Sequence, residues 1–149
     1  MNPLLILNSP FSILNFQKRG DRVASSGTIL LIDSDSNQNI SNQRALERKK
    51  FAVHTATDYA EARRIIHEAE PDIIVMEAML PGGDGFTFCK EIRSLTSAYI
   101  LFLTCKTDSE DTKLGLNSGG DMYITKPFHM PELMARVEAA MCRRRKAFA

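Results

Sequence analysis

The sequence of 149 residues has few cysteines, almost no net charge and no long apolar run. Its three cysteines, Cys89, Cys105 and Cys142, are odd in number and widely spaced, so they indicate neither a disulfide framework nor a zinc site. This usage favours a cytoplasmic location. The formal net charge is +1, so there is no overall field that would attract nucleic acid or a membrane.

Residues 1–26 differ in composition from the rest. Their two short apolar runs are interrupted by Pro3 and Pro10 and are too short to span a bilayer. A signal peptide carries its basic residues before the apolar core, whereas here they follow it. We expect a flexible N-terminal extension. The alternative is a short segment that docks on a partner or on the domain.

From Gly27 onward, apolar runs alternate with helical patterns. The runs predict strands at 28–32, 51–56, 73–76, 99–103 and 122–124. Helices are predicted at 37–49, from a capping box at 58–61, after Gly85, from a capping box at 107–110, and from Pro131. Strands that are apolar throughout are typical of a parallel sheet buried on both faces. We therefore expect one doubly wound α/β domain over 27–146 with a five-stranded parallel sheet, and a tail at 147–149.

Apolar spacing also predicts which helix residues face the core. In the helix after Gly85, these are Phe88, Ile92 and Leu95. In the polar helix at 37–49, the main apolar residues are Ile40, Ala45 and Leu46. The basic run at 143–146 is interpreted as a solvated helix end rather than a nucleic-acid site.

Polar side chains follow four of the five predicted strands. Because the carboxyl ends of parallel strands meet at one edge of a sheet, we expect them to converge in a crevice. Carboxylates, a hydroxyl and an ammonium group together suit a phosphoryl group and a hard cation such as Mg²⁺. In chain order they are Asp33, Ser34 and Asp35, then Glu77, Thr104 and Lys126.

This order of motifs resembles the receiver domain of response regulators. The family pattern is an acidic pair after strand one, a phosphoacceptor Asp after strand three, Ser or Thr after strand four, and Lys-Pro after strand five. These fall on Asp33 and Ser34, Glu77, Thr104, and Lys126-Pro127. Residues 119–128 are similar to the winged-helix OmpR/PhoB subfamily. The resemblance implies a CheY-like, flavodoxin-like (βα)5 fold with strand order 2-1-3-4-5 and a cis Lys126–Pro127 peptide.

Two positions depart from that pattern. Glu77 replaces the phosphoacceptor Asp, which moves the carboxylate outward by one methylene toward Lys126 or Thr104 and misplaces an acyl phosphate. Ser34 replaces the second acid and weakens a metal site. We therefore predict a pseudo-receiver: a phosphorylation-independent signalling or dimerisation module that is not an enzyme and has no resident metal or cofactor.

Two interpretations of Glu77 stay open, a fixed mimic of the phosphorylated state and a tolerated remnant. Retention of Thr104 and Tyr123, which match the family's switch hydroxyl and aromatic residue, favours the mimic. The alternative function is a working phospho-receiver with weak Mg²⁺ binding at Asp33, Asp35 and Glu77. A flavin-binding protein is disfavoured because the turn at 33–37 is acidic and lacks glycine.

The resemblance further implies an output face made of helix four, strand five and helix five. The subfamily forms symmetric dimers there through reciprocal charge pairs. Thr112 and Met122 replace an Arg and an Asp of that set, so a dimer would be more hydrophobic. Expected partners at this face are a second copy, a histidine kinase or an output domain, with DNA contacted only through an absent output domain, and no membrane. The predicted face comprises Glu110, Asp121, Met122, Glu132 and Arg136.

Overall fold

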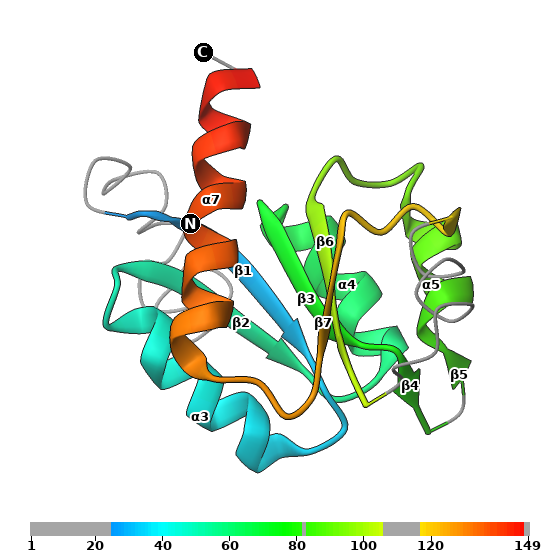
Figure 1. The fold of residues 1–149 in the computed structure, drawn as a ribbon. Helices are drawn as coiled ribbons and strands as arrows, with labels where there is room; N and C mark the ends of the chain where they lie inside the picture. Colours follow the sequence, from blue (N-terminus) through cyan, green and yellow to red (C-terminus); the bar gives the residue numbers. More distant parts are fainter. Residues whose placement is uncertain (1–24, 82, 106–116, 148–149) are drawn as a thin grey trace, which may run out of the picture.

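The protein's structure, a computed structural model, describes residues 25–81, 83–105 and 117–147. Five parallel strands form one sheet in the order β2-β1-β3-β6-β7 (Figure 1). This confirms the expected flavodoxin-like order 2-1-3-4-5. The strands are β1 (Gly27–Ile32), β2 (Phe51–Ala56), β3 (Ile73–Glu77), β6 (Tyr99–Thr104) and β7 (Met122–Thr125).

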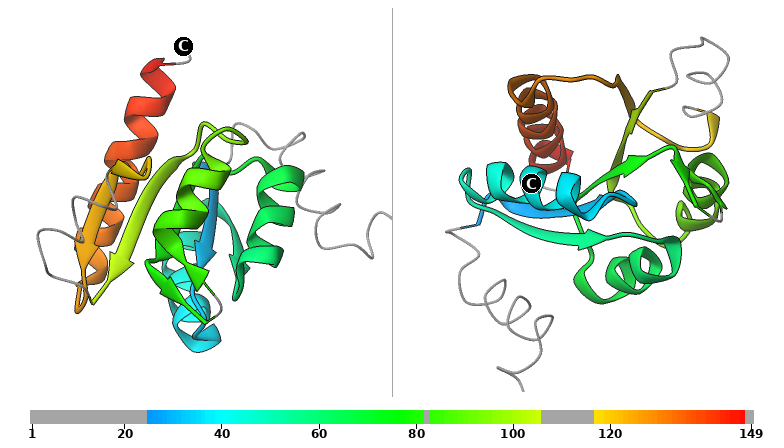
Figure 2. Two further views of the ribbon diagram at one scale, coloured as in Figure 1. Left: turned by 90° about the vertical axis from the view of Figure 1, so that its right-hand side faces the viewer. Right: turned by 90° about the horizontal axis from the view of Figure 1, so that it is seen from below.

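Helices cover both faces of this sheet (Figure 2). On one face lie α3 (Ser36–Glu47) and α7 (Met130–Ala147), and on the other lie α4 (Tyr59–Ala69) and α5 (Gly85–Ile92). The helix predicted from the capping box at 107–110 lies outside the described residues.

Three aspartates fix where the helices begin after the strand-end loops. The carboxylate of Asp35 accepts hydrogen bonds from the backbone N–H groups of Asn37 and Gln38 at the start of α3. Asp58 and Asp84 cap α4 and α5 in the same way. Such caps each contribute about 1 kcal/mol because they satisfy N–H groups that the helix leaves unpaired. They hold the loops at the carboxyl edge of the sheet.

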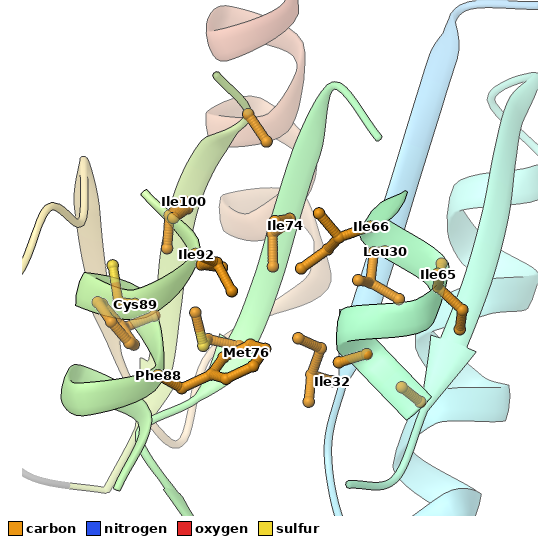
Figure 3. Close-up of a cluster of buried hydrophobic side chains, with 14 of the residues drawn as sticks. Leu30, Ile32, Ile65, Ile66, Ile74, Met76, Phe88, Cys89, Ile92 and Ile100 are labelled. Atoms are coloured by element: carbon orange, nitrogen blue, oxygen red, sulfur yellow. The ribbon is translucent and has the colours of Figure 1, made fainter. Parts of the chain in front are cut away.

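The central strands are buried on both faces because successive side chains point to opposite sides. Toward α4 and α5, Leu30, Ile32, Ile74 and Met76 form one core cluster (Figure 3). The alternate residues of β1 and β3 form the other cluster with α3 and α7. Each fully buried aliphatic side chain contributes about 1.5–3 kcal/mol. The two clusters therefore hold the strand ends, and any site built on them, in fixed positions.

The structure corrects the predicted burial of Leu95. Its exposed fraction is 63%. The helix predicted to bury it, α5, ends at Ile92, and the following turn is closed by the backbone hydrogen bond from Leu95 to Ile92. Leu95 is thus outside the helix, so the i, i+4, i+7 spacing of Phe88, Ile92 and Leu95 no longer directs it to the core.

The side of α3 that faces the sheet carries buried polar residues. Ile40 is 44% exposed, whereas Asn39 and Asn42 are buried. The Asn39 side-chain amide donates to the backbone carbonyls of Asp33 and Ala56, at 3.0 and 3.1 Å. A buried amide is tolerated when its hydrogen bonds are made. Here it joins the carboxyl ends of β1 and β2, so α3 turns its polar side toward the sheet.

A two-stranded hairpin that the sequence did not predict follows β3. It pairs β4 (Met79–Leu80) with β5 (Gly83–Asp84). It ends at Gly85, where a Cβ atom would lie 2.8 Å from the carbonyl oxygen of Ala78. Glycine is required there because the backbone passes so close. The hairpin carries the chain from the end of β3 directly into α5.

Candidate functional site

Three charged side chains converge at the carboxyl edge of the sheet. Lys126 Nζ lies 2.7 Å from Glu77 Oε2 and 3.3 Å from Asp33 Oδ2. The exposed fraction of the Lys126 side chain is 22%, and that of each carboxylate side chain is 14%. One ammonium group is therefore held between two largely buried carboxylates.

The backbone positions each member of this cluster. Glu77 is the last residue of β3, and its other oxygen accepts from the N–H of Ala78 at 3.1 Å. The other oxygen of Asp33 accepts from the N–H of Asp35 at 2.9 Å. Lys126 follows β7, is tied to β6 by its N–H bond to the carbonyl of Thr104, and precedes a cis peptide bond. Each carboxylate thus accepts a hydrogen bond from a backbone N–H with one oxygen and pairs with Lys126 through the other.

The electrostatics of the cluster favour charged Lys126. Burial lowers the pKa of Lys126, but its hydrogen bond and charge contact with Glu77, and then those with Asp33, outweigh burial and raise the pKa above its usual value. Oppositely charged neighbours stabilise the ammonium form. The cluster therefore remains ion-paired throughout the physiological range.

This shift predicts a loss of stability at alkaline pH. Because the pKa of Lys126 is higher in the folded chain, the ion pairs stabilise the fold below the unfolded-state pKa of about 10.4, and that contribution is lost as pH rises through the raised value. The pKa values of Tyr59 and Tyr99 are also raised, so their ionisation at alkaline pH destabilises the fold in the same direction. We expect urea unfolding between pH 8 and 11 to show a steeper decline for wild type than for Lys126→Met, which retains both tyrosines. Equal slopes would contradict the assignment.

The remaining predicted site residues surround this cluster. Thr104, 1% exposed, ends β6, and half-buried Tyr123 packs against Phe102 with ring centroids 6.3 Å apart. Ser34 and Asp35 are exposed. The structure therefore brings Asp33, Glu77 and Lys126 into contact, places Thr104 and Tyr123 on the neighbouring strands, and leaves the other two residues at the surface.

The predicted magnesium ligands do not form a fitting donor set. Lys126 occupies one oxygen of Asp33 and one of Glu77, while Asp35 caps α3. Within 25–81, 83–105 and 117–147, no group of three or more His, Cys, Asp or Glu side chains is arranged to hold a metal ion. Mg²⁺ needs several oxygens in near-octahedral geometry. These three carboxylates do not converge on one point in that way.

Only part of the predicted output face is exposed to solvent. Glu132 and Arg136 are exposed on α7, but Met122 is half-buried against the cluster under α3 and α7. Asp121 accepts from the N–H of Ile100 at 2.8 Å and pairs with Arg93 at 3.4 Å. Its charge is therefore used within the domain. The fifth residue of the face, Glu110, lies outside the described residues.

Arg93 is a structural residue that the sequence did not reveal. Its guanidinium donates to the carbonyls of Thr96, Ala98 and Gly119, joining the end of α5 to the segments before β6 and β7. The partners lie at no regular spacing, so no sequence motif predicts them. Within the basic run at 143–146, the structure corrects the expected solvation only for Arg144, which is 17% exposed and donates to the carbonyl of Ser97, whereas Arg143 and Arg145 are exposed.

Removing Arg93 should destabilise the domain. We expect Arg93→Ala to lower the free energy of unfolding by about 2–3 kcal/mol, because several carbonyls and Asp121 lose a charged donor together. The matched control is Arg64→Ala, which breaks an exposed pair with Glu68 and should cost under about 1 kcal/mol. Urea denaturation of both variants measures the difference. Equal costs would contradict the role of Arg93.

Comparison with known proteins identifies the family. The model of the response regulator receiver domain matches residues 29–138, so the chain belongs to that family. A two-component response regulator from Clostridium difficile is 35% identical, with a TM-score of 0.76, over 78% of this chain and 97% of that chain. A response regulator described as putative, from Chloroflexus aurantiacus, is 32% identical, with a TM-score of 0.72, over 78% and 98%. The BeF3-activated receiver domain of Klebsiella pneumoniae RstA is 25% identical, with a TM-score of 0.72, over 76% and 97%.

The chain thus contains the receiver domain of a two-component response regulator. Receiver domains are signalling modules that generally interact with histidine kinases and other proteins. Across the described part of the chain, no helix combines the length and apolar character needed to cross a membrane.

Proposed function

We propose that this receiver domain signals without being phosphorylated, and that the Glu77 carboxylate takes the place of a phosphoryl group on Lys126. The observation that carries the proposal is the 2.7 Å distance between Lys126 Nζ and Glu77 Oε2. A carboxylate supplies one negative charge, whereas a phosphoryl group supplies up to two and three acceptor oxygens. The mimic is weaker than a phosphate, but it is permanent.

The chemistry of the cluster opposes phosphotransfer. An acyl phosphate would have to form on a Glu77 oxygen, yet one is ion-paired to Lys126 and the other accepts from Ala78. Ser34 is neutral and exposed, so it supplies no anionic ligand for a cation at the position where the family has an acid. Displacing the reacting atoms by about 1 Å costs on the order of 100-fold in rate. The two departures therefore act together against the reaction.

The output of this module is a protein contact. The Thr104 carbonyl at the end of β6 accepts from the Lys126 N–H, and Tyr123 lies on β7, three residues before Lys126. A charge fixed at Glu77 therefore biases the strand that leads into α7. The exposed charges of Glu132 and Arg136 give α7 a polar contact surface. A second copy, a histidine kinase or an output domain would bind there. Similarity of residues 119–128 to the winged-helix subfamily supports a role in transcriptional regulation, with DNA contacted only by an output domain.

The second candidate function is a working phospho-receiver. Retained Asp33, Thr104 and Lys126 favour it, since these match the family's acid, hydroxyl and lysine. It requires Mg²⁺ to displace Lys126 from the carboxylates. This displacement costs the ion pairs that raise the pKa of Lys126.

Binding of beryllofluoride with Mg²⁺ distinguishes the two functions. In amide NMR spectra we expect neither reagent to shift Thr104 or Tyr123 of the wild type, because Lys126 holds the Glu77 carboxylate and the described residues place no group of three or more His, Cys, Asp or Glu side chains around a cation. Replacing Glu77 with Gln, which removes the charge and keeps the shape, should shift both amides if Glu77 is a mimic. Saturable beryllofluoride shifts in the wild type would establish the phospho-receiver instead. Unchanged spectra in Glu77→Gln would make Glu77 a remnant.

A further inference from the structure

A groove runs between α3 and α7, on the face of the sheet opposite α4 and α5. It consists of three adjoining hollows of about 600, 540 and 510 Å³, all lined by Met130 at the start of α7. One hollow extends beside Lys126 and Cys105, and another ends at Lys49 beyond α3. The groove therefore connects the carboxyl edge of the sheet with the opposite edge.

The floor of this groove is apolar. Met130 and Met134 are half-buried and pack on the core cluster under α3 and α7. Ile40, 44% exposed, lies on the α3 wall, and Pro131 lies on the α7 wall. Exposed apolar surface gains free energy when it is covered, at about 25 cal/mol per Å². This groove is thus a candidate docking surface.

The position at which the chain enters the domain identifies the occupant. Ser26 donates from its hydroxyl to the carbonyl of Lys49, at 2.9 Å, and accepts from Arg145 of α7, at 2.7 Å. It lies between the end of α3 and the last turns of α7, next to the hollow that Lys49 lines. The described chain therefore begins at one mouth of the groove, and 24 residues precede it in the sequence.

The composition of these 24 residues matches the groove. Residues 1–16 contain no charged side chain, and residues 17–24 contain three basic side chains and one acidic side chain. Eight connecting residues reach up to about 26 Å, and the 12 residues of α3 are about 18 Å long. The apolar block can therefore reach the whole groove. Its large apolar residues are Leu4, Leu5, Ile6, Leu7, Phe11, Ile13, Leu14 and Phe16.

We infer that residues 3–16 dock in the α3–α7 groove of their own chain, with leucine and isoleucine side chains against Met130, Met134 and Ile40. A short tether gives the segment an effective concentration in the mM range, so even modest apolar contact keeps it bound. The docked segment competes with any partner helix that would use the same groove, and this competition does not depend on the state of Glu77.

Methionine-methyl NMR of the full chain tests the inference. Leu5→Asp/Leu7→Asp places two charges in the apolar block and leaves the domain sequence intact. We expect the Met130 and Met134 methyl resonances to shift in this variant, while Met76, which is fully buried on the other side of the sheet, stays unchanged. The matched control Ser9→Asp/Ser12→Asp adds the same charges at polar positions and should leave all three resonances in place.

Three outcomes would overturn the inference. Met130 and Met134 could be insensitive to the leucine replacements, in which case the segment does not lie in the groove. They could respond equally to the serine replacements, which would indicate a charge effect alone. Their wild-type resonances could change on dilution together with dissociation of a dimer in light scattering, and the occupant would then be the segment of a second copy.

Discussion

Lys126→Met should lower the free energy of unfolding by about 2–3 kcal/mol at pH 7. The change removes the only cation that the structure places between Glu77 and Asp33, both 14% exposed, among the described residues. Removing one partner of a buried pair leaves its counter-charge unpaired, and that cost exceeds the net value of the pair itself. Urea denaturation of wild type and variant at pH 7 measures the difference.

Two further measurements show whether this cost is electrostatic. Between pH 7 and pH 4 the destabilisation should shrink, since protonation of Asp and Glu, with pKa values of about 3.9 and 4.3 in unfolded chains, relieves the repulsion. The control Glu77→Leu/Lys126→Met removes both charges and should be more stable than Lys126→Met alone. A cost that is independent of pH, or no recovery in the double variant, would show that Lys126 acts by packing.

Ser34→Asp/Glu77→Asp should convert the domain into one that accepts a phosphoryl group, with a labelling rate at least about 100-fold above wild type. In the wild type, Glu77 Oε2 lies 2.7 Å from Lys126 Nζ. The shorter Asp side chain moves the carboxylate away from Lys126 and leaves space for the phosphoryl group. The new carboxylate at position 34 supplies the anionic ligand that Mg²⁺ lacks there. Incubation with Mg²⁺ and a small acyl phosphate, followed by intact mass measurement, gives the rate.

A matched control separates geometry from charge. Ser36→Asp/Glu77→Asp carries the same charge as the active variant, but Ser36 is an exposed residue in the first turn of α3. It should be labelled no faster than Glu77→Asp alone. An unreactive Ser34→Asp/Glu77→Asp variant that remains folded would mean that these two departures are not what limits phosphotransfer.

The sequence predicts the sheet well because most of its strands are continuous apolar runs, although β2 contains His54 and Thr55. The order of the strands follows from the family resemblance, and the structure confirms it. The exposure of Leu95 could not be predicted from its spacing, because it depends on where α5 ends. Arg93 follows that end, and its carbonyl partners come from two separate segments, before β6 and before β7.

The site is predictable to the level of which strand ends meet. Convergence of Asp33, Glu77 and Lys126 follows from parallel strands, whose carboxyl ends share one edge. The sequence does not predict that Asp35 caps α3 or that Asp121 pairs with Arg93. Each interaction depends on a backbone N–H or a side chain whose position only the fold determines. The polar contact side of α3 was missed for the same reason: Asn39 satisfies two strand-end carbonyls.

The most direct measurement is the intact mass of the wild-type full chain after incubation with Mg²⁺ and a small acyl phosphate, with Ser34→Asp/Glu77→Asp labelled in parallel. We expect an unmodified wild type under conditions in which the variant gains a phosphoryl group, because Lys126 already holds the Glu77 carboxylate. A phosphoryl adduct on Glu77 of the wild type would contradict it and identify a working phospho-receiver.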